Sequence, residues 1–168
     1  AIAIEGAFAP AYHQKAEALT AMEKYGDALE VHRESLEVDA PQPSTLCYMG
    51  ECLEHMGSLD EAAEYYHQCL ELDPQFLEAH VGLGVLEDLK GNQEGALEHM
   101  ATALLQNPHH EDTLLMMATV LKKMGRHEEA DTCLVQLLER NPKHVEAWEE
   151  RVDNMQALEA HEQALILL

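Results

Sequence analysis

Two consecutive stretches of equal length decide the fold: PSTLCYMGECLEHMGSLDEAAEYYHQCLELDPQF (43–76) and LEAHVGLGVLEDLKGNQEGALEHMATALLQNPHH (77–110). They carry glycine, alanine and proline at the same offsets, and the prolines continue the step, with 34 residues from Pro74 to Pro108 and again from Pro108 to Pro142. A fixed period of this length predicts stacked helical hairpins, because one hairpin cannot bury its apolar face alone.

The period extends over nearly the whole chain and predicts a single array. The expected repeats are 9–42, 43–76, 77–110, 111–144 and a partial fifth at 145–168, with residues 1–8 as the end of a preceding repeat. One position is alanine in all five repeats: Ala28, Ala62, Ala96, Ala130 and Ala164. A small residue there lets the two helices of a hairpin approach closely, so a bulky substitution would overpack the crossing by about 1–3 kcal/mol.

The ends of the helices are also marked. A glycine at the turn of the three middle repeats (Gly57, Gly91 and Gly125) can supply a left-handed turn residue, whereas Glu23 and Glu159 hold that position in the outer repeats. We expect the second helix of the first repeat at about 25–38. Ser44 or Thr45 is the expected cap of the next helix, since a side-chain hydroxyl can accept from a free backbone N–H.

The composition excludes several classes of partner. The 168 residues carry 32 Asp and Glu against 10 Lys and Arg, for a formal net charge of −22. Nucleic acid and anionic membranes are therefore poor partners, because phosphate binding requires clustered basic residues. No run approaches the roughly 18 consecutive apolar residues that span a bilayer, so no membrane insertion is expected. From Glu34 to Leu89 there is no Lys or Arg at all, which indicates either a surface that steers a basic partner or a generally well-solvated exterior.

No pattern of catalytic, metal or cofactor residues is present. The four cysteines form no CxxC pair and are expected to be buried, reduced thiols, which fits a cytoplasmic protein. His109 and His110 are adjacent in an expected loop, a spacing that rarely lets two side chains converge on one metal ion. We find no nucleophile with a matching base, so we predict no enzyme activity, no catalytic residues, no metal site and no cofactor.

The spacing Gly-x4-Ala across the turn, together with proline near the repeat end, resembles the tetratricopeptide repeat (TPR). The resemblance rests on the three glycines, five alanines and three prolines that recur in phase. It implies an all-α, right-handed superhelical α-solenoid of about five antiparallel helix-turn-helix repeats of 34 residues. It also implies that the first helix of each repeat lines a concave groove, which typically binds an extended peptide or a helix of a partner protein.

The groove positions follow from the phase of the inward-packing residues Leu46, Met49, Gly50 and Leu53. The predicted partner-binding residues are Cys47, Tyr48, Glu51, Val81, Val85, Leu115, Met116 and Thr119. In the first repeat the matching positions hold His13, Gln14 and Glu17. One branch of the family grips a peptide carboxylate with Lys, Asn and Arg at these positions, and none of those residues occurs here. An apolar groove with acidic residues at its ends instead favours a basic or amphipathic segment.

Three functions remain open. The first is a scaffold that binds a protein or peptide partner. The second is a self-assembly module that forms a homo-oligomer, because the expected end faces carry no polar cap to hide their apolar residues. The third is a regulatory part of a larger enzyme. The sequence does not name the partner.

Overall fold

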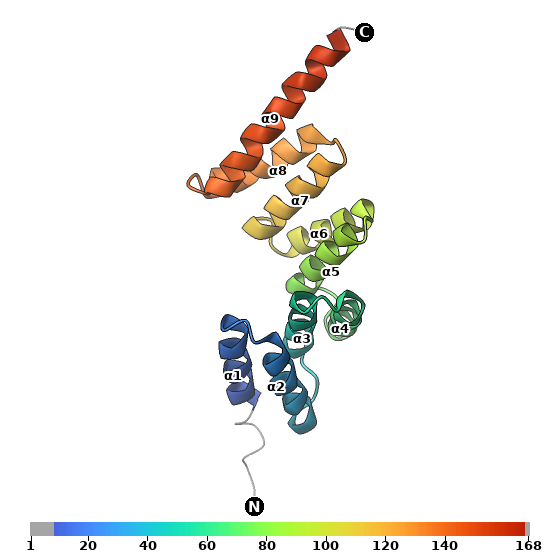
Figure 1. Ribbon diagram of the computed structural model, residues 1–168, viewed down its shortest axis with the longest axis vertical. Helices are drawn as coiled ribbons and strands as arrows, with labels where there is room; N and C mark the ends of the chain where they lie inside the picture. Colours follow the sequence, from blue (N-terminus) through green and yellow to red (C-terminus); the bar gives the residue numbers. More distant parts are fainter. Residues whose placement is uncertain (1–8, 167–168) are drawn as a thin grey trace, which may run out of the picture. The chain divides into compact units, whose positions relative to one another are not determined.

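The protein is described by a computed structural model that places the backbone of residues 9–166 and the side chains of residues 11–159 (Figure 1). Within these residues every regular element is an α-helix, and turns or short loops join the helices. The helices are α1 (Ala9–Ala21), α2 (Tyr25–Val38), α3 (Pro43–His55), α4 (Leu59–Leu72), α5 (Leu77–Leu89), α6 (Gln93–Gln106), α7 (Glu111–Lys123), α8 (His127–Arg140) and α9 (Val145–Ile166). The chain divides into two compact units, one up to Leu86 and one from Glu87 onward.

The first unit is built from helical hairpins around one core. Helix α1 packs on α2, α2 packs on α3 and α3 packs on α4. The predicted inward residues Leu46, Met49 and Leu53 are at most 4 % exposed, and Ala28 and Ala62 are fully buried. The small residues therefore lie where the helices approach closely, as the repeat pattern predicts.

The second unit repeats this packing with other side chains. Helix α6 packs on α7, α7 on α8, and α8 on α9. Ala96 and Ala130 are fully buried, and Leu114, Leu121 and Leu134 fill the space around them. Each hairpin thus contributes one strip to a core that extends along the unit.

The turns explain the in-phase glycines. Gly57, Gly91 and Gly125 have φ values of 80°, 81° and 74°, in the left-handed region that side chains disfavour. Glu23, at the same position in the first repeat, adopts φ 58° and is the non-glycine residue with positive φ in the described chain. The turn geometry is therefore dictated by the hairpin, and Glu23 accepts a backbone strain that glycine avoids.

Two local expectations are wrong. Neither Ser44 nor Thr45 caps a helix, because α3 begins one residue earlier at Pro43 and Gln42 stands at its N-cap without a side-chain hydrogen bond. No turn occurs at Glu159, because α9 continues to Ile166. The expectations for residues 1–8 and for the side chain of Ala164 lie outside the described residues.

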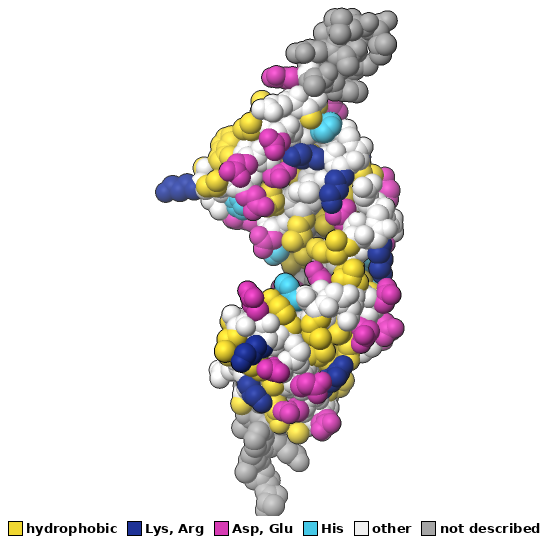
Figure 2. Space-filling model, viewed as in Figure 1, with side chains coloured by type: hydrophobic (Ala, Val, Ile, Leu, Met, Phe, Trp, Pro, Cys, Tyr) yellow, Lys and Arg dark blue, Asp and Glu magenta, His cyan; other side chains and the backbone are white. Residues whose placement is uncertain are grey.

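None of the described helices is both long enough and apolar enough to cross a membrane. Figure 2 shows acidic side chains spread over both units, interspersed with exposed hydrophobic ones.

Candidate functional site

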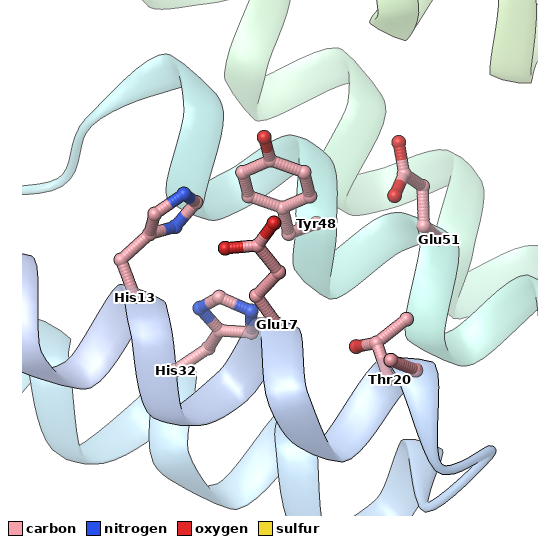
Figure 3. Close-up of a pocket in the computed structure, with 7 residues that line it drawn as sticks. His13, Glu17, Thr20, His32, Tyr48 and Glu51 are labelled. Carbon is pink, nitrogen blue, oxygen red and sulfur yellow. The ribbon is translucent and has the colours of Figure 1, made fainter.

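The first unit contains a pocket of about 300 Å³ between α1, α2 and α3 (Figure 3). The first helices of two successive repeats form two of its walls, and the second helix of the first repeat forms its base. Its lining side chains are His13, Glu17, Thr20, Ala21, His32, Tyr48 and Glu51. In Figure 3, Glu17 reaches from α1 toward α3, where Tyr48 stands out from the helix.

Three rings form the apolar part of the pocket. The Tyr48 ring lies parallel to that of His32, with 5.8 Å between centroids and 11° between planes. The His13 ring lies 5.0 Å from the Tyr48 centroid at an angle of 44°. Tyr48 remains 37 % exposed, so it offers a guest both aromatic area and a hydroxyl group.

His32 is the most deeply buried polar group of the pocket, with only 3 % of its surface exposed. Burial, together with a smaller effect of nearby His13, lowers the pKa of its imidazole to about 4. His32 is therefore neutral at pH 7, with one ring nitrogen able to accept a hydrogen bond. Within the described residues neither ring nitrogen makes a hydrogen bond, and neither is fully enclosed, so both can be reached from the pocket.

Glu51 is half-buried and carries an unusual carboxyl group. Burial, together with the neighbouring carboxylates of Glu54 and Glu78, raises its pKa to about 7. The Cys47 thiol donates a weak hydrogen bond to Glu51 Oε1 at 3.9 Å, which acts in the opposite direction. The carboxyl group is thus poised between its charged and neutral forms at neutral pH. Glu17, on the facing helix, is exposed.

One repeat further along, the equivalent space is filled. Tyr66 follows His32 by one period of 34 residues and is 1 % exposed. Its hydroxyl donates to Glu54 Oε2 at 2.9 Å. Its ring lies against Gly50 and Gly82, since a Cβ added at Gly50 would come within 2.7 Å of it and one at Gly82 would also clash. The two glycines are therefore required by the ring that packs on them.

The structure brings together only part of the predicted site. Tyr48 and Glu51 line the pocket, and they are joined there by His13 and Glu17 from the matching positions of the first repeat. The prediction that Cys47 faces the groove is wrong, because its side chain is 1 % exposed and packs in the core. Helix α3 buries more than one of its faces, since it is covered by α2 and by α4, and Cys47 lies on the additional buried face.

The remaining predicted residues lie outside the pocket. Val81 and Val85 are half-buried on α5. Leu115, Met116 and Thr119 are half-buried on α7, where Leu115 and Met116 pack beside the core of the second unit. The Thr119 hydroxyl donates to the Leu115 carbonyl at 3.1 Å within the same helix.

Three pocket residues were missed from the sequence: Thr20, Ala21 and His32. The sequence did hold an indication for His32, because the same position of the next three repeats holds the large residues Tyr66, Met100 and Leu134, each buried in the structure. A histidine at a position that otherwise holds large core residues indicates a buried polar group, which usually has a partner or a function.

The described residues contain no group of three or more His, Cys, Asp or Glu side chains that could hold a metal ion. His110 instead caps α7, where its Nδ1 accepts from the Thr113 backbone N–H at 3.3 Å. Cys47, Cys52 and Cys69 are buried, and burial raises the pKa of each thiol. Thiols with raised pKa values are poor nucleophiles, because the thiolate is the reactive form.

The geometry described above agrees with comparisons to known proteins. Two family profiles described as tetratricopeptide repeat match residues 43–76 and 89–151, which together make up more than half of the chain. The chain belongs to the tetratricopeptide repeat family. Its fold is an all-α solenoid of helical repeats, as the sequence predicts.

Relatives of known name match parts of this TPR chain. It is 24 % identical over 92 residues to Hsp70-Hsp90 organizing protein 2 of Arabidopsis thaliana, covering 55 % of the chain and 16 % of that protein. It is 40 % identical over 65 residues to protein arginine N-methyltransferase 9 of Homo sapiens, covering 38 % of the chain and 8 % of that protein. The TPR chain thus spans a small part of the length of these relatives.

Solved structures share the fold at low identity. MamA superposes with a TM-score of 0.75 at 18 % identity, over 94 % of this chain and 86 % of MamA. YrrB, described as a TPR protein with an unusual peptide-binding site, superposes with a TM-score of 0.69 at 21 % identity, over 84 % of this chain and 73 % of YrrB. At these identities the likeness concerns the fold alone.

Proposed function

We propose that this TPR chain is a protein–protein interaction scaffold, without catalytic activity, that binds a peptide or helical segment of a partner along the first helices of its repeats. The observation that carries the proposal is the pocket between α1, α2 and α3, which is concave and combines aromatic walls with carboxylates. Pockets of this kind, mostly apolar with a few convergent polar groups, are the usual form of a binding site.

The chemistry of the pocket favours a basic or amphipathic segment. Its lining holds two carboxyl groups and no Lys or Arg. Each unit has half-buried apolar side chains at the same helix positions, Val81 and Val85 on α5 and Leu115 and Met116 on α7, and each pair would offer apolar contacts to a bound segment. In groove recognition an amphipathic segment lays its apolar face along the groove, and its anchor side chains recur at helical spacing.

The similarity to Hsp70-Hsp90 organizing protein 2 supports a protein partner in general. It does not point to a site for a peptide carboxylate, because the first two repeats present His13, Glu17, Tyr48 and Glu51 at the groove positions. Two glutamates would repel a terminal carboxylate.

Affinity capture with the chain as bait tests this function. The wild type is compared with the double variant Tyr48→Glu, Leu115→Glu and with the control Glu64→Gln, which changes an exposed residue of α4. We expect one partner that is retained by the control, lost in the double variant and weakened in high salt. The same partner on all three baits would contradict binding through these positions, provided that the variants melt at the wild-type temperature.

A second candidate is self-association, and a specific observation on α9 favours it. Val145, Trp148, Val152 and Met155 recur at helical spacing and are 68 %, 45 %, 50 % and 47 % exposed. A second copy of the chain could cover this stripe. Sedimentation over a range of protein concentrations, with Trp148→Glu as the comparison, tests it, and a monomer at all concentrations would exclude it.

A third candidate is a non-catalytic part of a larger enzyme. The similarity to protein arginine N-methyltransferase 9 favours it, although it covers only 8 % of that protein. The length of the polypeptide in its source, measured by mass spectrometry, decides whether a further domain is attached.

A further inference from the structure

We propose that the pocket between α1, α2 and α3 binds the side chain of an arginine in the partner segment, an inference that rests on the scaffold function proposed above. The guanidinium group would lie against the Tyr48 ring and donate hydrogen bonds to Glu17, Glu51 and His32. Four features of the described residues carry this assignment.

The first feature is charge. Glu17 and Glu51 are the charged side chains of the lining, and they lie on facing helices. On the α3 side the sequence has no Lys or Arg between Glu34 and Leu89, and on the α2 side Arg33 is paired with Glu30. An anionic guest would face both carboxylates, whereas a cation is attracted by both and by the acidic surroundings.

The second feature is shape. The pocket of about 300 Å³ is small for a drug-sized molecule but has room for one long side chain. Its walls include the nearly parallel rings of His32 and Tyr48 and the tilted ring of His13. A planar guanidinium stacks on such rings, and its cation is attracted by the face of a tyrosine within about 6 Å.

The third feature is the hydrogen-bond acceptor of His32. The side chain as a whole is 3 % exposed, but no buried side-chain nitrogen among the described residues lacks a partner, so the ring nitrogens, which make no hydrogen bond there, are open to the pocket. Because the imidazole is neutral, it can accept a hydrogen bond from a guest that carries N–H groups. Arginine offers five such donors in a fixed plane, whereas lysine offers three on one point charge.

The fourth feature is the proton held by Glu51. The groups around it are Glu54 and Cys47 on α3, Glu17 and His13 on α1, His32 on α2, Tyr66 on α4 and Glu78 on α5. They include several carboxylates and no fixed cation, so the pKa of Glu51 is raised to about 7. An arginine would supply the missing cation, and binding should therefore release a proton near neutral pH.

Nuclear magnetic resonance tests the pocket without knowledge of the partner. The probe is N-acetyl-arginine amide, titrated into the ¹⁵N-labelled chain and compared with the neutral analogue N-acetyl-citrulline amide. We expect saturable shifts of the His13 and His32 imidazoles with a roughly millimolar dissociation constant for arginine. Citrulline should bind at least about tenfold more weakly, because it lacks the charge.

Matched variants show which groups hold the probe. Glu17→Gln and Glu51→Gln should each weaken binding several-fold, His32→Leu should weaken it without a change of charge, and the exposed control Glu64→Gln should leave it unchanged. Binding should strengthen up to about tenfold between about pH 6 and about pH 8 as Glu51 ionises, and Glu51→Gln should flatten this dependence. Equal binding of arginine and citrulline, or shifts that persist in the double variant Glu17→Gln, Glu51→Gln, would overturn the assignment.

A second measurement separates this inference from the scaffold function. Peptides selected from a random library against the chain are resynthesised with each arginine replaced by citrulline. A tenfold loss that disappears in the Glu17→Gln, Glu51→Gln variant supports the arginine pocket. Peptides that lose binding with Tyr48→Glu, Leu115→Glu but tolerate citrulline would refute the pocket and leave the scaffold function intact. If Tyr48→Glu, Leu115→Glu weakens the binding of no selected peptide, the scaffold function is refuted. The arginine pocket is then supported or refuted by the titration with N-acetyl-arginine amide alone.

Discussion

Two equivalent places in the first unit differ in one respect, since one is hollow and the other is filled. At the first, His32 of α2 faces Tyr48 of α3, and the pocket lies beside them. At the second, one period later, Tyr66 of α4 packs on Gly82 of α5, and its ring occupies the space. The two places have the same backbone arrangement, but the tyrosine ring comes from the first helix of a repeat in one place (Tyr48) and from the second helix in the other (Tyr66).

The difference shows how a repeat frame acquires a binding site. In the filled place the large side chain points into the hairpin stack and is 1 % exposed. In the hollow place the smaller His32 is buried, and the ring of Tyr48 stands outward, 37 % exposed. The filled place contributes to stability, whereas the hollow place offers surface to a bound side chain. Substitutions at the two places should therefore have different effects.

The largest effect is expected for Tyr66→Ala. Removing a fully buried ring leaves a cavity between Gly50 and Gly82, and the free energy of unfolding should fall by about 3–5 kcal/mol. Urea unfolding followed by circular dichroism measures it. The control Tyr66→Phe removes only the hydrogen bond to Glu54 and should cost about 1 kcal/mol. A loss below 1 kcal/mol for Tyr66→Ala would mean that the ring does not hold these helices together.

The next effect is expected for Gly82→Ala. The added Cβ would clash with the Tyr66 ring, and the overpacking should cost about 1–3 kcal/mol. Gly26→Ala is the matched control, because a Cβ at Gly26 meets no atom within 4 Å and alanine favours the helix. The two variants should therefore shift the melting temperature in opposite directions, and shifts of the same sign would contradict the comparison.

A smaller, pH-dependent effect is expected for His32→Leu. The unfolded chain takes up a proton at this histidine near pH 6.5, whereas the folded pKa is about 4, so the wild type loses stability as the pH falls through this window. Leucine is compatible with the position, since Leu134 occupies it two repeats beyond Tyr66. The variant should match the wild type near pH 7.5 and exceed it by on the order of 2 kcal/mol near pH 5. A gap that does not depend on pH would show that His32 is not buried in its neutral form.

A pH-dependent effect of similar size is expected for Glu51→Gln, because both pKa values move by about the same amount, and its pH dependence runs in the opposite direction. The folded pKa of about 7 lies above the ordinary value of 4.5, so the wild type is relatively most stable below pH 4.5 and loses this contribution as the pH rises through 7. The variant should be the more stable protein at about pH 8 and differ little at about pH 5. Melting curves at the two pH values measure it, and the reverse order would refute the raised pKa.

Much of the fold could be predicted because the 34-residue period sets where each helix begins and where each turn lies. The predicted starts 9, 43, 77, 111 and 145 are the first residues of α1, α3, α5, α7 and α9. The turn glycines have the positive φ that their position requires, and even Glu23 follows the same geometry. The continuous α9 was not predicted, because Glu159 resembles Glu23 in position and residue type while the chain around it takes a helical path.

The candidate site could be predicted only in part. The helical phase indicates that Tyr48 and Glu51 point away from the hairpin interior, and both line the pocket. The same phase placed Cys47 in the groove, although the broad buried surface of α3 removes it from solvent. The spacing of apolar residues shows which face of one helix is buried, but it does not show how many neighbouring helices cover that helix.

The family, the helical hairpins and the small residues at their crossings follow from the order of residues alone, because a 34-residue period with in-phase glycine, alanine and proline leaves few other ways to bury the apolar faces. The tertiary structure decided where the hollow lies. His13, Glu17, His32 and Tyr48 come from three helices and meet only after α1, α2 and α3 have packed. The shifted pKa values of His32 and Glu51 are likewise properties of the tertiary structure, because desolvation and neighbouring charges arise from packing and not from the order of residues in the chain.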